Sequence, residues 1–110
     1  MADVREPMSL QHPVLSLTTT VGSADDARRL VQGLLQARLA ACVQVQAGLS
    51  SHYRWEGRDC VDEEWRLTVK TAPWRRAQVE AYLANAHPYD LSQLLWPSMD
   101  ASDAYAAWVA

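Results

Sequence analysis

The sequence predicts an α+β fold: a ferredoxin-like split βαβ sandwich with the order β-α-β-β-α-β and a further C-terminal helix. Apolar residues recur at helical spacing in residues 24–38 and again after Pro73, whereas they alternate with a period of two along residues 41–71. Hydrophobic residues make up 49% and charged residues 21% of the 110 residues, which is a globular composition. A chain of this length forms one small domain.

The chain divides into two parts by composition. We expect residues 1–12 to form a flexible tail and residues 13–110 a single domain. The net charge of −3 and the scattered arginines argue against a nucleic-acid partner. No apolar run approaches the roughly 20 residues of a membrane span, and the N-terminal segment lacks the apolar region of a secretory signal. These features predict a cytoplasmic protein without a membrane partner.

The first strand and helix have clear boundaries. Residues 13–20 are apolar and β-branched, which predicts a buried strand. Ser23 is a suitable N-cap for a helix over residues 24–38, with Asp25 and Asp26 near the positive end of the helix dipole. An apolar stripe then follows at helical spacing, formed by Ala27, Leu30, Val31, Leu34 and Leu35.

A long hairpin follows the helix. From about residue 41 to 56, apolar residues share one parity, and residues 60–71 form the return strand after a turn at residues 56–58. Folding the hairpin about Gly57 predicts pairs of Tyr53 with Val61, Leu49 with Trp65, and Val45 with Val69. This register keeps Cys42 and Cys60 too far apart for a disulfide, and two free thiols fit a reducing compartment.

The remaining elements complete the pattern. Pro73 opens a second helix and His87-Pro88 ends it. Residues 90–99 predict a final strand, and residues 102–110 a last helix capped by Ser102 or Asp103.

The hairpin is long enough to predict self-association. A strand from Ala41 to Glu56 measures roughly 50 Å at ~3.3 Å per residue, whereas a compact domain of this length is roughly 35 Å across. The hairpin therefore overhangs the body, unless a bulge near Gly48 bends it back. We expect Tyr53, Trp55 and Trp65 to share one face of this ribbon. Exposed aromatic residues on a ribbon need a cover, and a closed homo-oligomer supplies one. The expected interface residues are Tyr53, Arg54, Trp55 and Trp65.

Five short motifs occur in order along the chain: ARLAACV at 37–43, S-x-Y-R-W-E-G at 51–57, V-K-T at 69–71, H-P-Y at 87–89, and Y-x-x-W at 105–108. Together they resemble the CutA family of divalent-cation-tolerance proteins. The resemblance implies a ferredoxin-like fold, a homotrimer held by long hairpins, and a cytoplasmic role linked to copper and other divalent ions.

The chain departs from the family pattern at three places. Val21-Gly22-Ser23 replaces a turn of Pro-Asp-Glu type, and Thr18 stands where some members carry a cysteine. Gln93 replaces a carboxylate that commonly follows the H-P-Y motif, which removes one charged metal ligand. These departures weaken a metal role carried over by analogy.

Two residues are candidate metal ligands. Cys42 and His87 are of the type that binds copper or zinc. Cys42 also suits a small buried residue at the start of a strand, and His87 also suits a helix cap. The sequence has no C-x-x-C or H-x-x-x-H pattern, so we expect no required cofactor and only possible binding of copper or another divalent cation.

An alternative function is the binding of a small metabolite or anion. A pocket between subunits could bind such a ligand. The candidates to line it, from one subunit or from two, are Glu64, Lys70, Tyr89 and Trp55, together with His87. A phosphate-binding loop, a nucleophile elbow and a Ser/His/Asp arrangement are all missing from the sequence, so we expect no enzymatic activity. The sequence therefore predicts a metal-linked binding or signalling module, with a metabolite sensor as the alternative.

Overall fold

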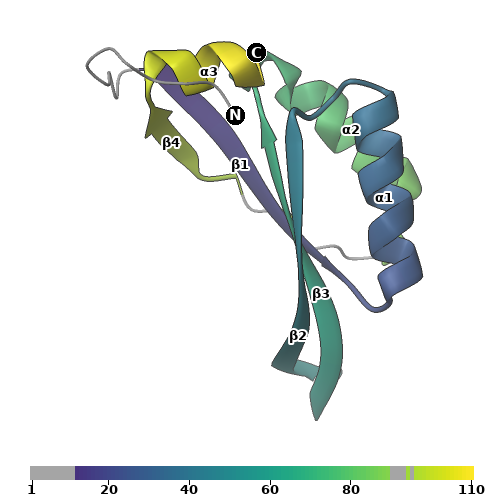
Figure 1. Ribbon diagram of the computed structural model, residues 1–110. Helices are drawn as coiled ribbons and strands as arrows, with labels where there is room; N and C mark the ends of the chain where they lie inside the picture. Colours follow the sequence, from purple (N-terminus) through teal and green to yellow (C-terminus); the bar gives the residue numbers. More distant parts are fainter. Residues whose placement is uncertain (1–11, 90–93, 95) are drawn as a thin grey trace.

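The elements of the computed structural model follow the predicted order (Figure 1). The structure describes residues 12–89, 94 and 96–110. The elements are β1 (His12–Val21), α1 (Ala24–Gln36), β2 (Cys42–Trp55), β3 (Arg58–Thr71), the 3-10 turn η1 (Pro73–Arg75), α2 (Arg76–Ala86), β4 (Ser98–Ala101) and α3 (Asp103–Val109). The strands form an antiparallel sheet in the order β2-β3-β1-β4, which confirms the ferredoxin-like fold.

Helices α1 and α2 cover one face of the sheet (Figure 1). The core lies between them and the sheet and consists of Leu17, Val21, Ala27, Leu30, Leu34, Leu67, Val69, Val79 and Leu83. The opposite face, which we call the open face, carries polar side chains along three neighbouring strands: Ser16, Thr18, Thr20, Gln44, Gln46, Arg66, Thr68 and Lys70. The alternation of apolar and polar residues along the strands therefore separates a buried face from a polar one.

Helix α1 begins as the sequence predicts and ends slightly earlier. The side chain of Ser23 accepts a 3.0 Å hydrogen bond from the backbone N–H of Asp26, so Ser23 is the N-cap. The helix ends at Gln36 because Arg38 adopts a φ of 56°, which is outside the helical region.

The β2–β3 hairpin has a tighter turn than expected. Glu56 and Gly57 alone form it, with φ values of 51° and 76°, as in a type I′ turn. Trp55 pairs with Arg58 and Tyr53 with Cys60, so the predicted pairing of Tyr53 with Val61 is wrong by one residue. A two-residue turn matches the right-handed twist of the strands better than the three-residue turn that we expected.

A β-bulge changes the register a second time. Ala47 and Gly48 together lie opposite Trp65, and Gly48 has a φ of 80°. The predicted pairs Leu49–Trp65 and Val45–Val69 are therefore wrong: Leu49 pairs with Glu64, and Val45 with Leu67. The extra residue lets both halves of the hairpin keep their hydrogen bonds on either side of the bulge.

The bulge also moves the aromatic residues to a different face. Beyond it, Tyr53 and Trp55 share a face with Glu64 and Arg66, which is the open face. Trp65 instead faces the helices and packs against the core. The expectation that Tyr53, Trp55 and Trp65 share one face is therefore wrong, because one inserted residue exchanges the two faces of a strand.

The predicted overhang of the hairpin is confirmed. The molecule measures 52 × 25 × 21 Å, and its radius of gyration of 15.5 Å exceeds the roughly 13 Å of a compact chain of this length. Figure 1 shows the distal half of β2 and β3 extending beyond both helices. The bulge at Gly48 therefore does not fold the hairpin back onto the body.

The final strand lies later than predicted. Residues 94, 96 and 97 are not in a strand, and β4 comprises Ser98–Ala101; residues 90–93 and 95 of the predicted strand lie outside the described residues. The backbone carbonyl of Pro97 accepts a 3.1 Å hydrogen bond from the N–H of Ser16, but proline cannot donate one in return. Helix α3 follows with Ser102 as its N-cap.

Within the described residues, the helices are all too short or too polar to cross a lipid bilayer.

Candidate functional site

A buried carboxylate lies where β1 ends. Glu64 is 8% exposed, and its Oε2 accepts a 2.7 Å hydrogen bond from the hydroxyl of Tyr89. Gly22 leaves room for this contact, since a Cβ atom at that position would lie 3.1 Å from the Tyr89 hydroxyl oxygen, closer than an ordinary van der Waals contact. Burial, followed by the hydrogen bond to Glu64, raises the pKa of Tyr89. The phenol therefore stays protonated and keeps donating to the carboxylate.

His87 holds the chain that leads to Tyr89. Its Nδ1 accepts a hydrogen bond from the backbone N–H of Tyr89 at 3.1 Å. Its Nε2 lies 3.0 Å from the carbonyl oxygen of Thr20 and 3.0 Å from the hydroxyl oxygen of Thr19. Because a backbone N–H can only donate and a carbonyl can only accept, the proton must sit on Nε2. His87 is thus a neutral imidazole of defined tautomer.

The surroundings of His87 favour this neutral form. Burial lowers the pKa of His87, and the hydrogen bond to the backbone of Thr20 only partly opposes that shift. A neutral imidazole binds a metal through a free nitrogen lone pair. The one lone pair of His87 is already used by the N–H of Tyr89, so the geometry describes a structural histidine.

The second candidate ligand lies elsewhere in the sheet. Cys42 is half-buried and pairs with Lys70, whereas Thr20, which contacts His87, pairs with Arg66. Lys70 and Arg66 are about 13 Å apart along β3 at ~3.3 Å per residue. Among the described residues, no three His, Cys, Asp or Glu side chains come together to hold a metal ion. The described part of one chain therefore does not provide a fitting set of ligands for a resident metal.

The four predicted pocket residues are only partly brought together. Glu64 and Tyr89 are in contact. Lys70 lies about 20 Å from Glu64 along β3, and Trp55 pairs with Arg58, about 20 Å away in the other direction. The ammonium group of Lys70 instead lies 6.0 Å from the centre of the Tyr105 ring. A pocket with all four residues requires at least two chains.

The predicted interface residues at the tip of the hairpin are solvent-exposed. Trp55 is 51% and Tyr53 is 42% exposed, and the Tyr53 hydroxyl donates a hydrogen bond to Asp62. That hydrogen bond raises the pKa of Tyr53 to about 12. Arg54 forms a 3.1 Å ion pair with Asp59. The tip therefore exposes two aromatic rings, and the polar side chains around them form hydrogen bonds and ion pairs within the chain.

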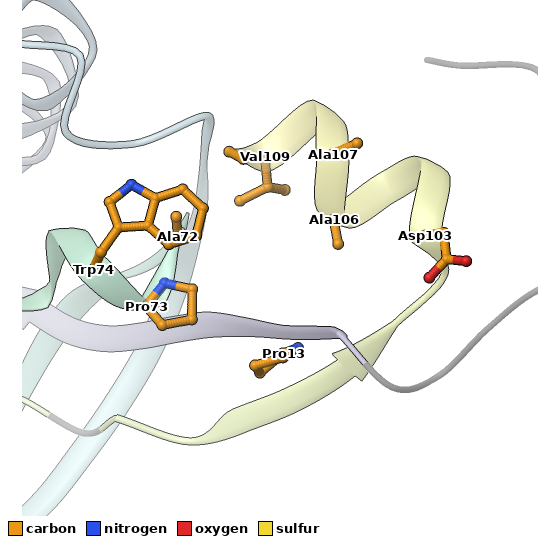
Figure 2. Close-up of a pocket in the computed structure, with 9 residues that line it drawn as sticks. Pro13, Ala72, Pro73, Trp74, Asp103, Ala106, Ala107 and Val109 are labelled. Carbon is orange, nitrogen blue, oxygen red and sulfur yellow. The ribbon is translucent and has the colours of Figure 1, made fainter.

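The structure also contains a cavity that the sequence did not indicate. It has a volume of about 390 Å³ and lies between α3, η1 and the start of β1 (Figure 2). The indole ring of Trp74, which is 68% exposed, borders it with Pro13, Pro73 and Val109. Its walls come from three segments that are far apart in the chain and contain mostly small apolar residues, so no local motif marks it.

Residues 15–110 match the sequence model of the family described as "CutA1 divalent ion tolerance protein". The chain belongs to the CutA1 family. It is 34% identical over 91 residues to "Divalent-cation tolerance protein CutA" of Thermus thermophilus, covering 82% of this chain and 88% of that protein. It is also 30% identical to "Protein CutA, chloroplastic" of Arabidopsis thaliana, covering 94% of this chain but only 58% of the plant protein.

The fold agrees with solved CutA structures. CutA from Synechococcus elongatus superimposes with a TM-score of 0.88 at 31% identity, covering 94% of this chain and 92% of that one. CutA1 from Ehrlichia chaffeensis gives a TM-score of 0.85 at 26% identity, covering 90% and 94% of the two chains. The resemblance inferred from the five sequence motifs is thereby confirmed.

Proposed function

We propose that this CutA-family chain is a homotrimeric binding or signalling module of divalent-cation tolerance, with copper as the principal ion and with no enzymatic activity. The observation that carries the proposal is the projecting β2–β3 hairpin, which exposes Tyr53 and Trp55 on a molecule 52 Å long. Large exposed aromatic groups on a ribbon are a liability unless another chain covers them. Two free cysteines support a reducing location, and we place the protein in the cytoplasm.

The role of the metal must be consistent with the geometry of one chain. His87 has no free lone pair, whereas Cys42 is half-buried and is a soft ligand that suits copper. We therefore propose that cations bind to the assembled protein and that Cys42 supplies one of the ligands. His87 stabilises the fold and does not bind the cation.

The assembly is tested by native mass spectrometry and sedimentation at micromolar concentration. We expect a single species of three chains. The double variant Tyr53→Ser/Trp55→Ser should dissociate at concentrations where the wild type does not. The control is Trp74→Ser, which removes an exposed indole from a different part of the surface. A wild-type protein that sediments as a monomer contradicts the proposal.

Calorimetric titration with copper and zinc tests the metal role. We expect saturable copper binding that Cys42→Ser weakens and His87→Gln leaves unchanged. The control is Cys60→Ser, since Cys60 lies near the hairpin tip, opposite Tyr53. If His87→Gln abolished copper binding while Cys42→Ser bound copper like the wild type, His87 and not Cys42 would be the metal ligand.

A second candidate function is the binding of a small metabolite. The cavity beside Trp74 favours it, because about 390 Å³ falls within the range of ligand sites and its walls are largely apolar. A thermal-shift screen of organic anions and nucleotides tests this function. A metabolite sensor would be favoured by a compound that stabilises the wild type but not Trp74→Ser, together with no calorimetric binding of any metal tested.

A further inference from the structure

The cavity beside Trp74 has two chemically different ends. Figure 2 shows the indole ring of Trp74 at one end and the carboxylate of Asp103 at the other, with Pro13 and Ala106 between them. The other described residues that line the cavity are all apolar, and most are small: Pro13, Ala72, Pro73, Ala106, Ala107, Val109 and Ala110. The cavity is therefore an apolar slot that has an aromatic ring at one end and an acidic group at the other.

Both ends of the slot are held in place by the sheet. Trp74 lies in η1, which follows β3, and Asp103 begins α3, which follows β4. Both strands pair with β1, the strand that carries Pro13. The indole is 68% exposed, so a ligand that covers it gains free energy from the burial of apolar surface. The site is thus preformed, as ligand sites usually are.

The charges around the slot favour a cation. Asp103 is the one charged side chain among the described residues that line it. Arg75, the neighbour of Trp74, donates a 2.8 Å hydrogen bond to the carbonyl oxygen of Arg38 after α1. Arg76 forms an ion pair with Glu80 within α2. The basic side chains that follow Trp74 are therefore engaged by α1 and α2.

A second carboxylate strengthens this preference. Asp100 is exposed and pairs with Pro13 across β1 and β4. Residues directly opposite each other in an antiparallel pair lie on the same face of the sheet, so Asp100 lies on the face on which Pro13 lines the slot. Two acidic groups at this edge of the sheet attract a positively charged ligand and repel an anion.

We propose that the slot binds a small aromatic amine, whose ring packs against the indole of Trp74 and whose ammonium group pairs with the carboxylate of Asp103. This inference rests on the second candidate function, the binding of a metabolite, and names the class of ligand. Aromatic rings attract each other in offset or edge-to-face arrangements. An ammonium group donates charge-assisted hydrogen bonds to a carboxylate, and these are about twice as strong as neutral ones.

Three probes of similar size and different charge test the class of ligand. At pH 7, 2-phenylethylamine is positive, 2-phenylethanol is neutral and phenylacetate is negative. Nuclear magnetic resonance titration of the full chain gives a dissociation constant for each. We expect the amine to bind about three- to tenfold more tightly than the alcohol, because only the amine forms a charge-assisted hydrogen bond. Phenylacetate should bind most weakly.

Two variants test the two ends of the slot. Asp103→Asn keeps the size of the side chain and should reduce the affinity for the amine to that for the alcohol. Trp74→Leu keeps an apolar side chain without the ring, and should weaken the binding of both probes by a similar factor. The controls are Asp25→Asn on α1 and Trp108→Leu on α3, which remove an exposed carboxylate and an exposed indole that do not line the slot. Circular dichroism establishes that each variant is folded.

The possible results separate this inference from the proposed function. Equal affinity for amine and alcohol, tighter binding of phenylacetate, or no binding of any probe would each show that the class of ligand is wrong. If Trp74→Leu, and not Asp103→Asn, removed the preference for the amine, the role of Asp103 would be wrong. A different compound whose stabilising effect depends on Trp74 would leave the second candidate function standing. The trimer and the binding of copper are measured independently of these probes.

Discussion

The hydroxyl group of Tyr89 reaches the carboxylate of Glu64 across Gly22. The oxygen atoms of the hydrogen bond are 2.7 Å apart, and a Cβ atom on residue 22 would lie 3.1 Å from the same hydroxyl oxygen. This contact joins the loop after α2 to β3 across the end of β1. The glycine at position 22, where the family pattern has a different turn, leaves room for this hydroxyl group.

Removal of the Tyr89 hydroxyl should destabilise the fold. Tyr89→Phe leaves the buried Glu64 carboxylate without its donor, which costs about 1–3 kcal/mol in the free energy of unfolding. Chemical denaturation of the variant measures this cost. The control is Tyr105→Phe, whose hydroxyl has no hydrogen bond in the described part of the chain. Equal stability of the two variants would show that the Tyr89–Glu64 bond contributes little.

Stability should fall in mild acid because of His87. Its pKa is lowered in the folded protein, so the unfolded chain takes up the proton first as the pH falls below the ordinary value of about 6.5. The contribution of His87 is therefore complete above that value and is lost as the pH falls toward the lowered pKa. The unfolding free energy of the wild type minus that of His87→Gln, measured from pH 7.5 to 5, should decrease. His52→Gln, on the exposed hairpin, should leave the profile unchanged.

A glycine in α1 should not tolerate alanine. In an isolated helix Gly-to-Ala stabilises by about 1 kcal/mol. A Cβ atom on Gly33, however, would lie 1.6 Å from the hydroxyl oxygen of Tyr82 on α2. We expect Gly33→Ala to destabilise the protein by about 1–3 kcal/mol, as for an overpacked core. In a Tyr82→Ala background the same change should cost much less. A stabilising effect of Gly33→Ala in the wild type would contradict this packing.

Deletion of Gly48 should remove the bulge and exchange the faces of the distal hairpin. Tyr53 and Trp55 would then lie on the side of the helices, because a shift of one residue turns every side chain over. We expect the subunit to fold and the assembly to be lost, as measured by sedimentation. Gly48→Asn keeps the residue count and tolerates the φ of 80°, so it should assemble. Normal assembly after the deletion would exclude Tyr53 and Trp55 from the interface.

The fold was predictable because its signals are local. The N-cap at Ser23, the period of two along the hairpin and the prolines at both ends of the second helical segment each depend on a few neighbouring residues. The overhang followed from strand length alone. The start of β4 was less predictable, because its pairing with β1 depends on where the preceding loop meets the sheet.

The candidate site was only partly predictable. Glu64 and Tyr89 were both identified and lie in contact, although 25 residues separate them in the chain. His87 was identified by its chemical type, but its role depends on Thr20 and on the backbone of Tyr89, which no sequence pattern links to it. The hydrogen bonds on both ring nitrogens decide its role.

The amino-acid sequence by itself determined the order of the elements, the N-cap of the first helix and a hairpin longer than its domain, because periodicity and capping act within a few residues. The tertiary structure alone decided which face Tyr53 and Trp55 occupy, which tautomer His87 adopts and where Tyr89 finds its acceptor. The one extra residue at the bulge turns the side chains of the distal half of β2 to the other face of the sheet, while apolar and polar residues still alternate along the strand. Hydrogen-bond partners come from strands that are distant in the chain.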